Sequence, residues 1–139
     1  YNTSYLLISH DMGVIESVAD RLAVMYLGKV VETGRIEDVF EPPFHPYTRA
    51  LLTSIPSLQP GADDHRIALD GDVPSARRPP SGCSFQTRCP RKIDGVCDVE
   101  EPTLEAVESA GDGDQSHCIS CHLDEEDMSA GIETPEKNL

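Results

Sequence analysis

All five cysteines of this 139-residue chain lie in one segment, at positions 83, 89, 97, 118 and 121. Cysteine thiolates are soft ligands that suit zinc and iron–sulfur clusters, and four of them complete a tetrahedral or cubane site. Five cysteines gathered in one segment of a chain that has none elsewhere do not have the pattern of scattered core residues. The sequence therefore predicts a metal site here.

The residues alone do not decide which metal this site would bind. Zinc is one candidate, because Cys118-x-x-Cys121 has the spacing of zinc ligands and His117 and His122 flank it as nitrogen donors. An iron–sulfur cluster is another, and a disulfide framework would require an oxidising compartment. Residues 118–122 also match the C-x-x-C-H signature of haem attachment, a single match of five residues.

A second candidate for chemistry is His10, which follows the apolar run Tyr5–Ile8. Such a run is typical of a strand buried on both faces in a parallel sheet, and polar groups at the carboxyl end of such strands meet ligands. An imidazole here could hydrogen-bond a phosphate oxygen or an attacking water, and a satisfied structural histidine is the alternative.

The elements that would position these residues are short. Helical spacing of apolar residues predicts a helix over residues 12–19, and two apolar runs around Leu27-Gly28 predict a hairpin of residues 21–26 and 29–33. A short helix over residues 35–40 should stop at Pro42-Pro43, and another should begin at Pro46 and end at Pro56. At that helix start, His45 is expected to be a capping or packing residue.

The remainder of the chain has less regular patterning. Residues 57–82 are rich in proline and glycine and predict an extended connector. Residues 82–122 contain few large apolar groups, so this segment is expected to need a metal or crosslinks to fold. From Leu123 onward the chain has too little apolar content to fold alone, which predicts a disordered tail.

Charge is distributed unevenly along the chain. The net charge is -14, yet residues 1–93 hold 11 acids and 10 bases, whereas residues 94–139 hold 14 acids and only Lys137. This acidity excludes nucleic acid as an expected partner, and the scarcity of lysine suggests a salt-adapted, halophilic source. No apolar stretch is long enough to cross a membrane. Because the chain begins at Tyr1 rather than Met, we expect it to be the C-terminal piece of a longer protein.

Two stretches resemble a known family. YLLISHDMGVIESVADRLAVMYLGKVVETG is similar to the end of the nucleotide-binding subunit of ABC transporters, in which a histidine within Ser-His-Asp follows a strand, and His10 matches that position. EPPFHPYTRALLTSIP resembles a segment specific to the oligopeptide and dipeptide branch, with its His-Pro-Tyr at residues 45–47. The ordered set of these motifs predicts membership of that branch.

This resemblance implies a function. His10 would contact the γ-phosphate of ATP and couple it to a second ATP-binding subunit, and the pair would drive membrane-spanning permease subunits that import peptides. An extracellular peptide-binding protein would take part indirectly, and the subunit would lie at the cytoplasmic face of the cell membrane as a peripheral protein. Because no Walker A, signature or Walker B motif occurs in these residues, this stretch alone is expected to be inactive.

The resemblance also implies a set of metal ligands. ATPases of this branch often end in a pattern like G-C-x-F-x-x-R-C-P with two further cysteines, reported to hold a 4Fe-4S cluster. Cys83, Cys89, Cys97 and Cys121 match that pattern, whereas Cys118 is an extra thiol that could replace Cys121 after a small loop shift. The reducing cytosol in which ATP is found argues against disulfides.

We therefore expect an α/β fold: the end of a P-loop ABC-type nucleotide-binding domain followed by a small irregular cysteine-rich metal-binding module. The expected divisions are residues 1–56 for the nucleotide-binding part, 57–81 for a linker, 82–123 for the cluster-binding module and 124–139 for an acidic disordered tail. The alternative function is a free-standing cysteine-rich metal-binding interaction protein without ATPase activity.

Overall fold

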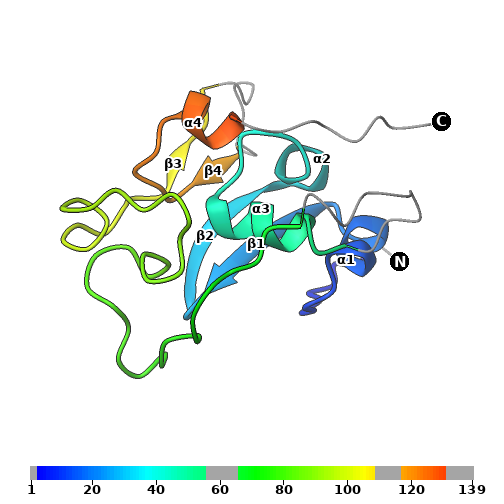
Figure 1. Ribbon diagram of the computed structural model, residues 1–139. Helices are drawn as coiled ribbons and strands as arrows, with labels where there is room; N and C mark the ends of the chain where they lie inside the picture. Colours follow the sequence, from blue (N-terminus) through cyan, green and yellow to red (C-terminus); the bar gives the residue numbers. More distant parts are fainter. Residues whose placement is uncertain (1–2, 56–65, 109–116, 131–139) are drawn as a thin grey trace.

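A computed structural model describes residues 3–55, 66–108 and 117–130 of the chain (Figure 1). It shows a mixed α/β fold in which one antiparallel sheet has the strand order β1-β2-β4-β3. Short helices pack around this sheet, and α3 lies across the β1–β2 hairpin in Figure 1. Among the described residues, no helix has the length and apolar character needed to cross a membrane.

The hairpin is the most regular part of the sheet. Strand β1 (Arg21–Tyr26) and strand β2 (Lys29–Arg35) pair antiparallel, which confirms the predicted hairpin. Leu27 and Gly28 have φ values of 47° and 80°, the backbone that a two-residue primed turn requires. Along β1 burial alternates, with Leu22, Val24 and Tyr26 facing the core. This face is what the rest of the chain packs against.

Three helices form where the sequence predicts them. Helix α1 (Met12–Val18) begins after Asp11, whose carboxylate accepts a hydrogen bond from the Val14 amide. Helix α2 (Ile36–Val39) follows β2 directly, and helix α3 (Pro46–Leu52) has proline in its first turn. These helices are short, so packing against the hairpin rather than intrinsic propensity holds them.

The predicted strand at Tyr5–Ile8 is wrong for this structure. These residues form no strand, and Tyr5, Leu6 and Ile8 are about as exposed as in an extended chain, at 90%, 92% and 90%. A buried parallel strand needs hydrogen-bonding neighbours, and the described residues place none beside this segment. The apolar run therefore has the composition of a core strand without a core around it.

The C-terminal half joins the same sheet through two very short strands. Strand β4 (Cys118–Ile119) pairs with β2 on one side and with strand β3 (Glu105–Ala106) on the other, so that Ile119 lies opposite both Glu32 and Glu105. Residues 66–104 have no helix or strand. Pro56 and part of the predicted connector at 57–81 lie outside the described residues. The predicted boundaries between segments stay predictions.

The start of the expected disordered tail is ordered. Helix α4 (Glu125–Ser129) begins at Asp124, whose carboxylate accepts a hydrogen bond from the Asp127 amide at 2.7 Å. The prediction fails here because one apolar residue, Met128, is buried against Val107 and Ile119, and a cap compensates for the low apolar content. Residues 131–139 lie outside the described residues.

Phe85 is the centre of the core. Its side chain is completely buried, and its ring lies 5.1 Å from the ring of Tyr26 and 5.3 Å from that of Tyr47. Tyr26 and Tyr47 also contact each other edge to face at 4.9 Å. Because Phe85 comes from the cysteine-rich segment and the tyrosines from β1 and α3, this aromatic cluster binds the two halves of the chain together.

We expect Phe85→Ala to lower the free energy of unfolding by about 3–5 kcal/mol, because it removes a large buried ring and leaves a cavity. Chemical denaturation followed by tyrosine fluorescence measures the change. Val99→Ala, at a side chain that is 72% exposed, is the matched control and should change stability by less than about 0.5 kcal/mol. Equal losses in the two variants would contradict the central role of Phe85.

Candidate metal centre

Four of the five cysteines are linked through their effects on one another's pKa values. Burial, with a smaller contribution from negative charge on Cys89, Cys83 and Cys97, raises the pKa of Cys121 to about 12. Burial likewise raises the pKa of Cys89 to about 11, again with contributions from Cys83 and Cys97. Thiols influence one another in this way only when they are close. In the packing of apolar side chains, Cys83, Cys97 and Cys89 belong to one cluster, whereas Cys121 packs against the cluster of Val107, Ile119 and Met128.

A tight backbone crossing places Cys83 beside Cys97. The Cys83 amide donates a hydrogen bond to the Cys97 carbonyl at 2.8 Å. At Gly82, which has a φ of 66°, a Cβ atom would lie only 2.4 Å from that carbonyl oxygen. Only glycine fits such a conformation and approach. The Gly82-Cys83 pair in the sequence is thus a geometric requirement of the site.

Backbone amides point at the sulfur atoms of this cluster. The Ile93 amide donates to Cys97 Sγ at 3.4 Å, and backbone hydrogen bonds from Phe85, Arg91 and Leu123 act on the pKa of Cys83, Cys89 and Cys121 respectively, each lowering it. Hydrogen bonds of this kind stabilise thiolate charge. Burial outweighs them, so a bound cation or cluster is what would hold these sulfurs as thiolates.

The described cysteines do not form a recognisable metal site. Among the described residues, no group of three or more histidine, cysteine, aspartate or glutamate side chains is arranged to hold a single metal ion. In a 4Fe-4S cluster each thiolate binds a different iron, so its ligands stand further apart than those around one zinc ion.

Cys118 occupies a different position from Cys121. It lies in β4 opposite Thr33 of β2 and Ala106 of β3. Side chains alternate along an extended chain, and Cys121 packs in the same apolar cluster as Ile119. Cys118 therefore belongs to the face of the strand opposite Ile119, and the choice between Cys118 and Cys121 as a ligand stays a prediction.

The two histidines beside this pair are engaged elsewhere. His117 Nε2 lies 2.7 Å from Glu32 Oε1, in an interaction that is buried on both sides. His122 Nε2 lies 2.9 Å from the Glu100 carbonyl oxygen. In this structure both imidazoles use their Nε2 atoms to hold protein groups rather than to approach the cysteines.

Glu32 is a buried carboxylate at the junction of three segments. Its side chain has no exposed surface, and burial raises its pKa, against the opposing effect of hydrogen bonds. Besides His117, Glu32 Oε2 accepts a hydrogen bond from the His45 amide at 2.9 Å. A carboxylate in β2 therefore fixes both the start of α3 and the residue that precedes β4.

His45 is the residue that caps α3. Its Nδ1 accepts a hydrogen bond from the Tyr47 amide at 3.1 Å, which confirms the expected capping role. The Ser120 backbone has a smaller, opposite effect and raises the pKa of this ring. Burial lowers the pKa of His45 to about 4. The residue is thus a neutral imidazole near neutral pH.

His10 is placed away from this centre. Its side chain is exposed just before α1, and in Figure 1 α1 lies at the opposite end of the hairpin from the loops of residues 82–100. The neighbouring Ser9 Oγ accepts a hydrogen bond from the Asp11 amide, and Asp11 caps the helix. The Ser-His-Asp triplet thus has a fixed local form that presents His10 at the surface.

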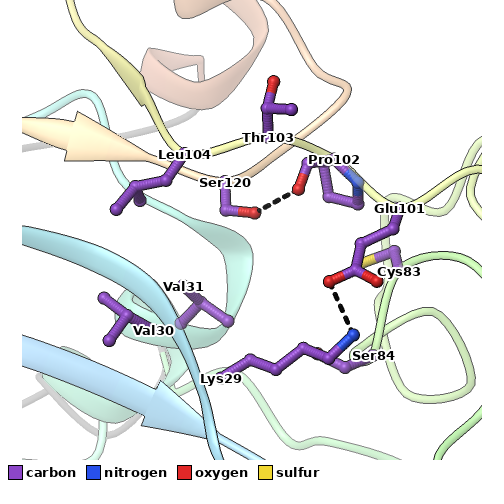
Figure 2. Close-up of a pocket in the computed structure, with 10 residues that line it drawn as sticks. All are labelled: Lys29, Val30, Val31, Cys83, Ser84, Glu101, Pro102, Thr103, Leu104 and Ser120. Carbon is purple, nitrogen blue, oxygen red and sulfur yellow. Dashed lines mark hydrogen bonds and ion pairs between the residues drawn. The ribbon is translucent and has the colours of Figure 1, made fainter.

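A pocket of about 570 Å³ opens beside Cys83, as Figure 2 shows. Lys29 Nζ and Glu101 Oε1 form an ion pair at 2.6 Å within it, and Ser120 Oγ donates to the Pro102 carbonyl. The ion pair is half exposed and is worth less than about 1 kcal/mol. Sequence reasoning missed Lys29 and Glu101, because no motif marks two isolated charges that are far apart along the chain.

Comparison with known proteins adds the family context. Residues 31–97 match the family described as the oligopeptide/dipeptide transporter C-terminal region. A protein of Brucella ovis, named for peptide import and ATP binding, is 51% identical over 102 residues, which are 73% of this chain and 32% of that protein.

Two further relatives have similar names. The dipeptide transport ATP-binding protein DppF of Escherichia coli is 47% identical over 73% of this chain and 30% of its own length. The oligopeptide transport ATP-binding protein AppD of Bacillus subtilis is 43% identical over 91% of this chain and 36% of its own length. The chain therefore spans about a third of these curated relatives.

The depressed pKa of His45 predicts an acid-sensitive fold. The unfolded histidine binds a proton near its ordinary pKa of 6.5, whereas the folded one does so only near 4, so stability is present above 6.5 and is lost as the pH falls towards 4. The loss attributable to His45 is roughly 3 kcal/mol.

Unfolding free energies of the wild type and His45→Gln, measured between pH 7 and 4.5, test this expectation. The difference between the two proteins should shrink towards acid pH, because glutamine does not titrate. The matched control is His10→Gln at an exposed site, which should leave the pH dependence unchanged. A His45→Gln profile parallel to that of the wild type would contradict the assignment.

Proposed function

Because this chain belongs to the family of oligopeptide/dipeptide transporter C-terminal regions, we propose that it is the C-terminal part of an ATP-hydrolysing subunit that energises peptide import through an ABC transporter. The observation that carries the proposal is the similarity over 91% of the chain to a named oligopeptide transport ATP-binding protein. The fold proposed for the complete subunit is a P-loop nucleotide-binding domain to which the cysteine-rich segment is appended.

His10 is the residue proposed to act on ATP. Its exposed side chain, held between Ser9 and the helix cap Asp11, is suited to reach a phosphate bound by another part of the same subunit. A hydrogen bond from imidazole to the γ-phosphate would help to position the phosphoryl group and the attacking water. Mg-ATP is therefore the proposed nucleotide of the intact subunit.

The proposed partners follow from the proposed role in an ABC transporter. They are a second ATP-binding subunit and the membrane-spanning permease subunits, with an extracellular peptide-binding protein contributing indirectly. The proposed location is the cytoplasmic face of the membrane, as a peripheral protein. A salt-adapted source for this acidic chain stays a prediction.

A 4Fe-4S cluster held by Cys83, Cys89, Cys97 and Cys121 is the proposed metal group, with zinc as the alternative. The effect of Cys83, Cys89 and Cys97 on the pKa of Cys121, the Ile93 amide directed at Cys97 Sγ and the tight turn at Gly82 support this proposal. A bound cluster would supply the positive charge that keeps the thiols ionised. The nearby Arg91 also favours the thiolate of Cys89.

In the full-length polypeptide that carries this chain, His10→Ala should lower the rate of ATP hydrolysis by roughly 100-fold or more, with a much smaller effect on ATP affinity. A phosphate-release assay on the assembled transporter measures the rate. Glu16→Ala, an exposed change on α1, is the matched control. Wild-type turnover in the His10 variant would contradict the proposed role.

Anaerobically purified full-length polypeptide should be brown and contain about four iron and four sulfide per chain, as expected for one 4Fe-4S cluster. Elemental analysis and the visible absorption spectrum measure this directly. Cys83→Ser should abolish iron binding because it removes a ligand. A colourless protein with bound zinc would overturn the iron–sulfur assignment.

A further inference from the structure

A slot the width of one strand opens in the sheet where β4 ends. Strands β2 and β3 both pair with β4, so they lie two strand spacings apart, about 10 Å. Beyond Ile119 the chain leaves the sheet, whereas β2 continues towards the hairpin turn. The pocket beside Cys83 occupies the resulting gap, with Val30 and Val31 on one wall and residues 102–104 on the other (Figure 2).

Ser120 closes one end of this slot, and an ion pair closes the other. The Ser120 amide donates to the Val31 carbonyl at 2.9 Å and its hydroxyl donates to the Pro102 carbonyl at 2.8 Å, so this residue bridges both walls. Towards the hairpin turn, Lys29 Nζ and Glu101 Oε1 lie 2.6 Å apart (Figure 2). At the spacing of a strand, the slot between these ends is about three residues long.

Backbone groups of both walls face the slot. Lys29 pairs with Tyr26 beside the two-residue turn, where the backbone of such a residue bonds the partner strand, so that of Val30 points away from β1. On the other wall, the Val107 amide donates to the residue before β4, and alternation turns the backbone of Thr103 to the same side. Among the described residues, no backbone hydrogen bond involves Thr103. Both walls therefore offer N–H and C=O groups to an entering strand.

We propose that this slot binds a short peptide, about three residues long, as an added extended strand between β2 and residues 102–104. Adding a strand to unpaired backbone groups is a general mode of peptide recognition. The volume of about 570 Å³ is typical of small-ligand sites, and Val30, Val31 and Leu104 supply apolar surface for side chains. The inference rests on the proposed function only for the source of the ligand, since a peptide importer would deliver short peptides to the side of the membrane proposed for this subunit.

The ion pair at the end of the slot indicates which peptides fit best. Antiparallel pairing is slightly more stable than parallel pairing, and a peptide antiparallel to β2 ends with its carboxylate beside Lys29. Lys29 then leaves Glu101, whose carboxylate needs a new cation. A C-terminal arginine or lysine supplies both charges, its carboxylate for Lys29 and its side-chain cation for Glu101. Because the existing ion pair is half exposed, opening it costs little.

The test is isothermal titration calorimetry of the full-length polypeptide that carries this chain, with the tripeptide Val-Thr-Arg as the probe. The wild type should bind this peptide saturably. The C-terminal amide of the same peptide should bind roughly 10- to 100-fold more weakly, because it lacks the carboxylate that Lys29 would hold. Val-Pro-Arg should bind roughly 10-fold more weakly, because proline removes a backbone donor.

Two variants locate the site, at side chains that are exposed enough to be changed without unfolding the protein. Lys29→Gln should weaken binding of Val-Thr-Arg and Val-Thr-Val alike, by roughly 10- to 100-fold, because both peptides carry the carboxylate. Glu101→Gln should weaken Val-Thr-Arg by roughly 10-fold or more without weakening Val-Thr-Val, which has no side-chain cation. Glu37→Gln, in the exposed ion pair with Arg35, is the matched control and should leave both affinities unchanged.

The outcomes separate this inference from the proposed function. Absence of saturable binding at millimolar Val-Thr-Arg would overturn the inference, and so would equal affinities in the wild type, Lys29→Gln and Glu101→Gln. Phosphate release is measured on the same preparation. ATP hydrolysis without peptide binding would refute the peptide slot alone, whereas peptide binding by a polypeptide that hydrolyses no ATP in the assembled transporter would refute the ATPase role alone.

Discussion

The burial of one carboxylate constrains most of this structure. Glu32 lies in a strand with no exposed surface, and a buried acid is tolerated only where donors surround it. Those donors come from His45, thirteen residues along the chain, and from His117, eighty-five residues along it. Satisfying one side chain therefore fixes where α3 begins and where the last strand joins the sheet.

The aromatic core extends this constraint to the cysteines. Phe85 packs against Tyr26 of the hairpin and also lies 5.7 Å from the ring of His45. It is two residues from Cys83, so the packing that orders the hairpin also orders the first thiol. Burial raises the pKa values of Cys89 and Cys121, so unligated thiols at these positions stay protonated. Any metal bound must displace those protons.

Local signals in the sequence predicted the local structure well. The Leu27-Gly28 turn and the proline at the start of α3 each depend on neighbouring residues, and each appears as expected. The role of Glu32 could not be predicted from the sequence. An acid between Val31 and Thr33 has the pattern of a solvent-facing residue, and only a strand from the far end of the chain covers it.

Long-range pairing also explains the two errors. Tyr5–Ile8 has strand composition, but composition does not supply neighbouring strands, and the short helix near Met128 depends on contacts with Val107 and Ile119. The set of four cysteine ligands comes from residue type and family pattern and stays a prediction, as does the choice between Cys118 and Cys121.

The exposed run at Tyr5–Ile8 has a practical consequence for the colloidal behaviour of this chain. Apolar, β-prone segments that lack a partner tend to pair with copies of themselves. The acidic residues 94–139, with 14 acids and one lysine, oppose such association by mutual repulsion. Since salt screens that repulsion but leaves the apolar attraction, a preparation of this chain should be most monodisperse at low ionic strength and should self-associate as salt is added.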